Sequence, residues 1–493
     1  MTRIAAVITA SDAGEAERQA RTALSRGADL AEIRLDHLAN PSVGAVRRLA
    51  AAVGSRSIAT LRSRTQGGGP GSADTRRDSL LREMSAARFA YLDIELRADG
   101  GGATDLTRRA KRHRGIVIVS HHFDRSTDAA TIEDTLEACA AVGDVAKVAV
   151  PVGDVDAAMQ IVDLQRRSAR NHPTTLIGTG IEGTITRVLA EDSAQEIQYA
   201  ALGGAALLGQ LPLAVAMRLR GRKPMVLGLV GHPLGHSLSP AIHEASLDAL
   251  RLPAVYLPFD VTAESLDALM LAADRLRVRG FNVTTPYKET IAPKLDELDG
   301  DAERLGAVNT VVVSDGWTKG HNTDVFGFRL SLRSLGLRVG DRTALVLGAG
   351  GAAKAVVDVL LREGATVQVA NRSLVHAESL AEGFNETVEV LPIDSLPRRG
   401  PWDLLVNATP VGTKGFPPGP PVPDAVVAKA GFVYDLGYNP SATPLLGAAK
   451  RLGKPGSSGL EMLLHQAAKS FELWTGRPAA VDAMRRAAKE ALG

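Results

Sequence analysis

Thr343-Ala-Leu-Val-Leu-Gly-Ala-Gly-Gly-Ala-Ala353 is a short apolar run followed by a glycine-rich turn and the start of a helix. This order is typical of a dinucleotide-binding Rossmann unit, in which glycines let a pyrophosphate approach the backbone N–H groups at a helix N-terminus. The same glycine pattern also occurs in ordinary turns, so its surroundings decide the interpretation. If the unit binds a dinucleotide, the turn residues expected to line the cofactor are Gly348, Ala349, Gly350, Gly351 and Ala352.

The segment after this turn indicates which dinucleotide is bound. The next apolar run, Thr366–Ala370, ends in Asn371-Arg372-Ser373, about 20 residues past the turn, where an NAD site would carry an acidic residue for the ribose hydroxyl. Arg372 instead suits a 2′-phosphate, because a guanidinium pairs with the phosphate that a carboxylate would repel. The sequence therefore predicts NADP(H) rather than NAD.

The segments before the turn are rich in hydroxyls and amides at the ends of predicted elements. They are Ser237-x-Ser239-Pro240, Asn282-Val-Thr284-x-Pro286-x-Lys288, Ala307-Val-Asn309-Thr310 and Asn322-Thr-Asp324. Such groups suit a small polyhydroxy acid. Each has an ordinary alternative, since the serines could cap a helix, the asparagine could sit in a turn and the lysine could be solvated. His232, His236 and His243 offer no coherent metal-ligand spacing, so no metal is predicted.

The N-terminal half alternates short apolar runs with stretches of helical period. Eight runs at roughly 25-residue spacing predict a parallel (β/α)8 barrel, although periodicity alone leaves a doubly wound sheet open. The runs are Ile4–Thr9, Ala28–Leu35, Ser57–Leu61, Ala90–Leu96, Gly115–Ser120, Val145–Val150, Thr174–Gly178 and Ala205–Leu208.

Polar residues stand where several of these runs end, as catalytic groups do in barrel enzymes. Two-residue alternation puts Glu32, Arg34 and Asp36 on one face, and similar residues follow in Arg62, Ser120-His121-His122, Arg187 and Gln210. Lys147 lies inside an apolar run, where a buried amine needs a partner or a use, and a neutral amine is a Schiff-base nucleophile. The alternatives are a surface salt bridge for a strand-end arginine and a solvated loop for a histidine.

In order along the chain, Glu32-x-Arg34-x-Asp36, Thr60-x-Arg62, Ser120-x-His122, Lys147-x-Ala149, Gly183-x-x-x-Arg187 and Gly209-Gln210 resemble the type I 3-dehydroquinate dehydratases. The resemblance implies that Lys147 forms an iminium with the substrate ketone and that His122, rather than His121, takes the C2 proton. It implies that the polyol and carboxylate are held by Glu32, Arg34, Arg62, Arg187 and Gln210. Two positions depart from the family: Gln66 replaces a glutamate that partners the histidine, which predicts a weakened His122 dyad, and Ala206 and Leu208 alter the covering loop.

From about Gly228 onward the chain resembles the shikimate dehydrogenases. The matching segments include Gly231-x-Pro233-x-x-His236-Ser-x-Ser239-Pro240, the lysine and asparagine motifs above, Asn407-Ala-Thr-Pro-x-Gly412, Tyr434-Asp-x-x-Tyr438 and Glu461-Met-Leu-x-x-Gln466. The resemblance implies that Lys288 and Asp324 are the catalytic pair. It implies that substrate is bound by Ser237, Ser239, Thr284, Asn309, Tyr438 and Gln466, and that the cofactor is also lined by Asn371, Arg372, Ser373, Thr409 and Gly437.

The whole chain then fits a fusion of two consecutive enzymes of the shikimate pathway, converting 3-dehydroquinate to 3-dehydroshikimate and this to shikimate. The expected organisation is a barrel over 1–220, a substrate lobe over 225–325 completed by 458–493, and an NADP lobe over 326–457. A chain with an impaired barrel that is mainly a shikimate or quinate dehydrogenase, and a non-catalytic metabolite sensor, are the alternatives.

Composition supports small-molecule chemistry. The 493 residues are 45% hydrophobic and 23% charged, and 57 basic against 55 acidic side chains give a net charge of +2. This balance argues against a nucleic-acid or membrane-surface partner bound by charge. Cys139 is the only cysteine, which excludes an intrachain disulfide and fits a cytoplasmic protein. The oligomeric state stays open.

Overall fold

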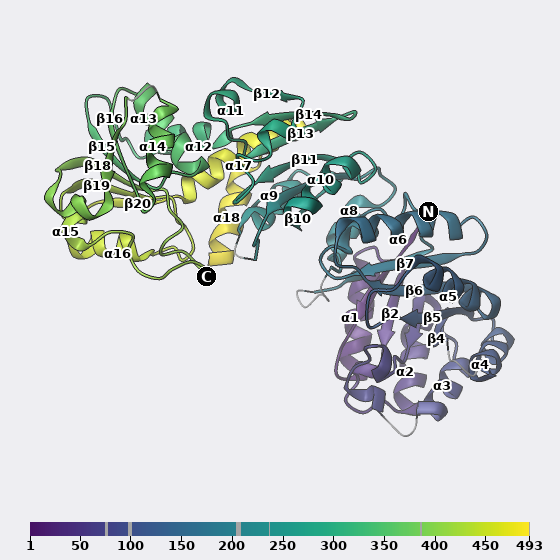
Figure 1. Ribbon diagram of the computed structural model, residues 1–493. Helices are drawn as coiled ribbons and strands as arrows, with labels where there is room; N and C mark the ends of the chain where they lie inside the picture. Colours follow the sequence, from purple (N-terminus) through teal and green to yellow (C-terminus); the bar gives the residue numbers. More distant parts are fainter. Residues whose placement is uncertain (74–76, 97–100, 204–208, 236, 385–386, 493) are drawn as a thin grey trace. The chain divides into compact units, whose positions relative to one another are not determined.

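The computed structural model describes residues 1–493 apart from 74–76, 97–100, 204–208, 236, 385–386 and 493 (Figure 1). The chain forms two compact units. The first comprises residues 1–225 with the short segments 252–255 and 263–276, and the second comprises 226–251, 256–262 and 277–493.

The first unit contains a parallel eight-stranded sheet in the order β7-β6-β5-β4-β3-β2-β1-β8. The backbone N–H of Glu196, just before β8, donates to the carbonyl of Thr174 on β7 at 2.9 Å, which brings the two ends of the sheet together. This arrangement confirms the predicted (β/α)8 barrel. Its strands are β1 (Arg3–Ile8), β2 (Leu30–Arg34), β3 (Ser57–Thr60), β4 (Tyr91–Glu95), β5 (Ile116–His122), β6 (Val145–Pro151), β7 (Thr174–Thr179) and β8 (Ile197–Ala201).

Helices alternate with these strands, as expected for parallel crossovers. They are α1 (Ala13–Ser25), α2 (Val43–Val53), α3 (Arg77–Ala86), α4 (Gly101–Arg112), α5 (Ala129–Val142), α6 (Val155–Ser168), α7 (Thr184–Val188) and α8 (Leu213–Leu219).

The eighth strand differs in position from the prediction. It is Ile197–Ala201, paired with Arg3–Val7 of β1, whereas the predicted run 205–208 lies outside the described residues. The polar Gln198 hides this strand in a search for continuous apolar runs. Its side-chain amide donates to the carbonyl of Arg187 at 2.9 Å, so the buried polar group is satisfied.

Inside the barrel, the side chains near the amino ends of the strands are apolar, and those nearer the carboxyl ends are polar. Leu30, Ile58, Tyr91, Ile118 and Val145 belong to one buried apolar cluster. Two and four residues further on, the same faces carry polar side chains. The resulting series are Leu30-x-Glu32-x-Arg34, Ile58-x-Thr60-x-Arg62, Tyr91-x-Asp93-x-Glu95, Ile118-x-Ser120-x-His122 and Val145-x-Lys147.

The second unit holds most of two further sheets (Figure 1). One is mixed, in the order β10-β9-β11-β13-β14-β12. The other is parallel, in the order β17-β16-β15-β18-β19-β20, which is the 3-2-1-4-5-6 order of a Rossmann fold. The predicted two-lobed α/β architecture with a Rossmann lobe is confirmed.

The strands of the mixed sheet are β9 (Met225–Gly231), β10 (Ala254–Asp260), β11 (Val278–Val283), β12 (Glu297–Leu298), β13 (Thr310–Ser314) and β14 (Trp317–His321). Those of the Rossmann sheet are β15 (Thr343–Leu347), β16 (Thr366–Asn371), β17 (Glu389–Pro392), β18 (Trp402–Asn407), β19 (Ala430–Asp435) and β20 (Gly456–Ser458). The helices are α9 (Ser239–Ala249), α10 (Ala263–Ala272), α11 (Gly300–Leu305), α12 (Thr323–Ser334), α13 (Gly351–Arg362), α14 (Leu374–Glu382), α15 (Asp424–Val427), α16 (Pro444–Arg451), α17 (Leu460–Thr475) and α18 (Val481–Leu492). None of the described helices is long and apolar enough to cross a membrane.

Candidate active sites

Lys147 stands inside the barrel with its amine enclosed by other side chains. Its Nζ donates to Asp93 Oδ2 at 3.0 Å and to Glu32 Oε1 at 3.3 Å. The residue is 4% exposed, and the ring of Tyr199 lies beside the amine. The buried lysine predicted from the sequence therefore has two carboxylate partners.

Asp93 connects this lysine to the other polar residues of the barrel. Its carboxylate also accepts from Arg62 Nη2 at 2.9 Å and from Ser120 Oγ at 2.6 Å, while Arg62 Nη1 donates to Ser120 Oγ at 2.7 Å. Burial raises the pKa of the Asp93 carboxyl, but the charges of Arg62 and Lys147 outweigh burial and hold that pKa well below its usual range. The sequence prediction missed Asp93. Its signal was present in Tyr91-Leu-Asp-Ile-Glu95, which repeats the alternation of Glu32 and Arg34.

His122 lies on the same face of β5 as Ser120, and Ser120 pairs in register with Lys147. Burial, together with the positive charges of Arg62 and Lys147, lowers the pKa of His122 well below its ordinary value. Its Nδ1 is buried and has no hydrogen-bond partner among the described residues. Gln66 Oε1 accepts instead from the backbone N–H of His122 at 3.0 Å, so this glutamine fixes the strand end and not the imidazole.

The remaining predicted site residues of the barrel make no described hydrogen bond to Lys147 or Asp93. Arg34 makes a two-pronged ion pair with Asp36, at 3.0 and 2.7 Å. Arg187 is buried, its Nε has no partner among the described residues, and burial lowers its pKa to about 10. Gln210 is partly buried, with no described contact to Lys147. Ala206 and Leu208 lie outside the described residues, as does His236.

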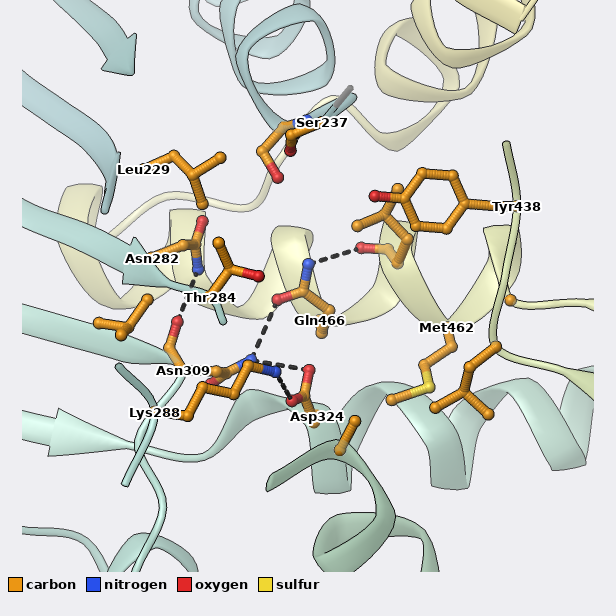
Figure 2. A pocket seen from close by; sticks show the side chains of 16 residues that line it. Leu229, Ser237, Asn282, Thr284, Lys288, Asn309, Asp324, Tyr438, Met462 and Gln466 are labelled. Carbon is orange, nitrogen blue, oxygen red and sulfur yellow. Dashed lines mark hydrogen bonds and ion pairs between the residues drawn. The ribbon is translucent and has the colours of Figure 1, made fainter. Parts of the chain in front are cut away.

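The second site is a cavity of about 200 Å³ in the second unit (Figure 2). It brings together every substrate-binding residue predicted for the dehydrogenase half, namely Ser237, Ser239, Thr284, Asn309, Tyr438 and Gln466, with Lys288 and Asp324. Asn282 of β11 and Met462 and Leu463 of α17 also line it and were not predicted as site residues. The two residues of α17 belong to the quoted motif Glu461-Met-Leu-x-x-Gln466, but only the packing of that helix puts them at the cavity.

Lys288 and Asp324 form the polar centre of this cavity, as Figure 2 shows. Lys288 Nζ donates to Asp324 Oδ2 at 2.5 Å. Asn309 Nδ2 donates to Asp324 Oδ1 at 2.9 Å and to Gln466 Oε1 at 3.3 Å. The backbone N–H of Thr323, at the start of α12, donates to Asn309 Oδ1 at 2.7 Å and fixes its amide. The carboxylate is thus held for the lysine by the asparagine.

The glycine turn of the Rossmann lobe lies against the Lys288 side chain. Gly348 has a φ of +111°, and a Cβ there would lie 3.0 Å from the carbonyl oxygen of Ala408, so the turn requires glycine. A Cβ on Gly350 would meet nothing within 4 Å, which leaves open space before α13, whose N-terminus has no side-chain cap. A Cβ on Gly351 would lie 3.3 Å from the Lys288 side chain. The turn therefore offers uncapped N–H groups for a pyrophosphate next to the lysine.

Four of the other predicted cofactor residues lie near the same turn, namely Asn371, Arg372, Ser373 and Thr409. The N–H of Gly348 donates to the carbonyl of Ala370 at 2.9 Å, which places the following Asn371, Arg372 and Ser373 beside it, and Arg372 is exposed. A Cβ on Gly348 would lie 3.1 Å from Thr409 Cγ2, so Thr409 borders the turn as well. Gly437 donates its N–H to Asp435 Oδ1 at 3.0 Å. Within the described residues no group of three or more His, Cys, Asp or Glu side chains is placed to hold a metal ion.

Comparison with known proteins gives the same division of the chain. Residues 4–219 match the family model of type I 3-dehydroquinase, 229–311 the substrate-binding domain of shikimate dehydrogenase, 330–411 shikimate/quinate 5-dehydrogenase and 459–489 the C-terminal domain of shikimate 5′-dehydrogenase. The chain belongs to the shikimate dehydrogenase family and carries a type I 3-dehydroquinase unit before it. Both resemblances are confirmed, and two such families in one chain match a bifunctional shikimate-pathway enzyme, a lyase joined to an oxidoreductase.

Individual relatives cover the dehydrogenase half. The NADP(+) shikimate dehydrogenase of Caldanaerobacter subterraneus is 46% identical over 256 residues, which are 51% of this chain and 91% of that protein. The corresponding enzyme of Archaeoglobus fulgidus is 41% identical over 54% of this chain and 99% of its own. A shikimate dehydrogenase solved with NADP+ superposes with a TM-score of 0.52 at 37% identity, covering 55% of this chain and 96% of that one. The Thermus thermophilus enzyme solved with NADP(H) and shikimate gives 0.50 at 39% identity, covering 54% and 100%.

Proposed function

We propose that this chain dehydrates 3-dehydroquinate in its barrel and reduces the product, 3-dehydroshikimate, to shikimate with NADPH in its second unit. The observation that carries the proposal is the contrast between two lysines. Lys147 is buried among barrel strands of a type I 3-dehydroquinase unit, and Lys288 is paired with Asp324 beside the glycine turn. The proposed boundaries are a barrel over 1–220, a substrate lobe over 225–325 with 458–493, and an NADP lobe over 326–457. On the basis of its single, buried cysteine we assign the protein to the cytoplasm.

In the barrel, the amine of Lys147 adds to the C3 ketone, and loss of water gives an iminium. The iminium acidifies C2, and His122 takes that proton, for which its lowered pKa keeps it neutral. The electron pair of the C–H bond forms the new double bond as the C1 hydroxyl leaves, protonated by His122. Hydrolysis of the imine returns Lys147, so the net loss is one water. The residues proposed to hold the polyol and carboxylate are Glu32, Arg34, Arg62, Arg187 and Gln210.

In the second unit, Ser237, Ser239, Thr284, Tyr438 and Gln466 would bind the substrate, with Asn309 orienting Asp324. Lys288 polarises the C3 carbonyl and gives its proton to that oxygen, while Asp324 holds the ammonium in place. When bound at the turn, NADPH would supply the hydride that the carbonyl carbon accepts. The turn residues Gly348 to Ala352 suit the pyrophosphate, Arg372 suits the 2′-phosphate, and the proposed contacts are completed by Asn371, Ser373, Thr409 and Gly437.

The test of the barrel reaction is to trap the imine. Borohydride added to the full chain with 3-dehydroquinate should leave the mass of the reduced imine on Lys147, located by peptide mass spectrometry. Without borohydride, the absorbance of the conjugated product should rise, and added NADPH should then be consumed. A chain that gives neither the adduct nor the absorbance rise would exclude the dehydratase, and one that oxidises no NADPH with supplied 3-dehydroshikimate would exclude the reductase.

A second candidate function is a dehydrogenase with an impaired barrel. The favouring observation is that Gln66 binds the backbone and not the ring of His122, which leaves Nδ1 without a partner. Comparing the two kcat values on one preparation separates the candidates. A dehydration rate far below the reduction rate favours the second.

A further inference from the structure

A tyrosine ring lies against the amine of Lys147, and the proposed chemistry does not use it. The Nζ atom is 3.8 Å from the centre of the Tyr199 ring, well inside the distance at which a cation is attracted to an aromatic face. Tyr199 is carried by β8 and Lys147 by β6, and each is 4% exposed. The contact is therefore shielded from water. A cation and an aromatic ring attract each other most strongly when both are removed from water.

The hydroxyl of Tyr199 is buried and makes no hydrogen bond within the described residues. Burial, with the negative charges of Glu32 and Asp93, raises the pKa of Tyr199 well above its ordinary value, so the phenol stays neutral. Tyr199 is thus not an acid or base here, and the ring face is the part that touches the amine.

The covalent step changes which contacts the nitrogen can make. As an ammonium, Lys147 has three donors and uses two of them on Asp93 and Glu32. As a protonated imine, the nitrogen keeps its positive charge but has a single N–H, so at most one carboxylate can still accept from it directly. The attraction to a ring face needs no N–H and acts on both states.

We propose that Tyr199 is a further catalytic residue of the barrel, whose ring face stabilises the cationic nitrogen of Lys147, above all in the iminium. This inference rests on the proposed Schiff-base function. It requires an electron-rich ring at position 199 but not its hydroxyl. An aliphatic side chain of similar size would exclude water equally well and leave the charge without that partner.

The test varies the electron density of the ring while keeping its shape. Tyr199→Phe should keep kcat for dehydration within about twofold, and Tyr199→Leu should lower it about tenfold, equivalent to about 1.4 kcal/mol. Replacing Tyr199 with phenylalanines that carry one, two or three ring fluorines should lower log kcat in steps, because each fluorine weakens the negative face of the ring. KM should change less than kcat, since the ring acts on the covalent intermediate.

Matched controls separate this role from core packing. Tyr91 is a second buried tyrosine of the same apolar cluster, whose ring faces Arg3 and not Lys147. Tyr91→Phe and Tyr91→Leu therefore report how the barrel responds to tyrosine changes away from Lys147. The NADPH-dependent rate of the second unit reports the amount of intact chain. A flat fluorine series, or a Tyr199→Leu variant as active as Tyr199→Phe, would overturn the inference while the wild-type adduct at Lys147 still formed. Absence of that adduct in the wild type would instead count against the proposed function.

Discussion

Lys147 and Lys288 are both paired with carboxylates, but their surroundings differ in kind. The side chain of Lys147 is 5% exposed and contacts two carboxylates and an aromatic ring, whereas that of Lys288 is 19% exposed and contacts one carboxylate at the edge of a cavity. A covalent nucleophile needs a site that excludes water and stabilises a charge retained on its nitrogen. A proton donor needs only to face the reacting oxygen and to recover its proton.

The partner carboxylates differ in the same way. Asp93 accepts from Lys147, Arg62 and Ser120, so it is fixed by a buried network on three strands. Asp324 accepts from Lys288 and Asn309 and lies in the first turn of α12, facing the cavity. The first carboxylate is part of the barrel's internal structure, and the second is a positioned group at the wall of a cavity.

Exchanging each lysine for arginine should give the largest effect and separate the two roles. Arginine stays protonated and cannot form the imine, so Lys147→Arg should reduce dehydration by about 10,000-fold or more. Lys288→Arg keeps a cation that can polarise the carbonyl, so reduction should fall only about 100-fold. The two rates, measured on each variant, should change independently. Equal losses for the two substitutions would remove the distinction between nucleophile and proton donor.

The sequence predicted each lysine and most of its neighbours, because local patterns carry that information. Glu32 and Arg34 follow from two-residue alternation, and the glycine turn follows from its spacing together with the apolar run before it and the helix start after it. Asp93 was missed although local alternation puts it on the inward face of its strand, and Tyr199 was missed altogether. The contacts of both residues with Lys147 join positions 54 and 52 residues apart, and these contacts depend on barrel closure and register. The eighth strand was misplaced because Gln198 interrupts its apolar pattern, and that error also hid Tyr199.

Asp93→Asn should show how much the buried carboxylate beside Lys147 stabilises the barrel. Removing one charge leaves Arg62 and Lys147 incompletely paired in the interior, which should lower the free energy of unfolding of the barrel by about 3 kcal/mol. The pKa of Asp93 is held below its ordinary value of 3.8, so its contribution is present above that pH and is lost as the pH falls further. The wild-type barrel should thus lose stability on acidification more steeply than the variant.

Hydrogen exchange of peptides spanning β4 measures this effect, with peptides from α12 in Asp324→Asn as the matched comparison. Protection of β4 that is unchanged in Asp93→Asn would show that the network does not support the fold.

Arg372→Ala tests the cofactor side of the Lys288 site. Because the guanidinium is expected to pair with the 2′-phosphate, KM for NADPH should rise about 30-fold while KM for NADH changes little. Dehydration in the barrel should be unaffected and serves as the internal control. A similar rise for both cofactors would contradict the phosphate assignment.

Gln66→Glu should give the smallest change. It should affect dehydration at Lys147, which is proposed to need His122 as a base, and leave reduction at Lys288 unchanged. A glutamate can keep the hydrogen bond from the backbone N–H of His122, at present 3.0 Å long, and adds a negative charge beside that residue. That charge opposes the burial and the cations that lower the pKa of His122, so the acid limb of kcat/KM for dehydration should move to higher pH. At neutral pH kcat should rise a few-fold, because a more basic His122 takes the C2 proton more readily. The pH profile of reduction at Lys288 should not move, and an unshifted acid limb for dehydration would show that His122 is not the base.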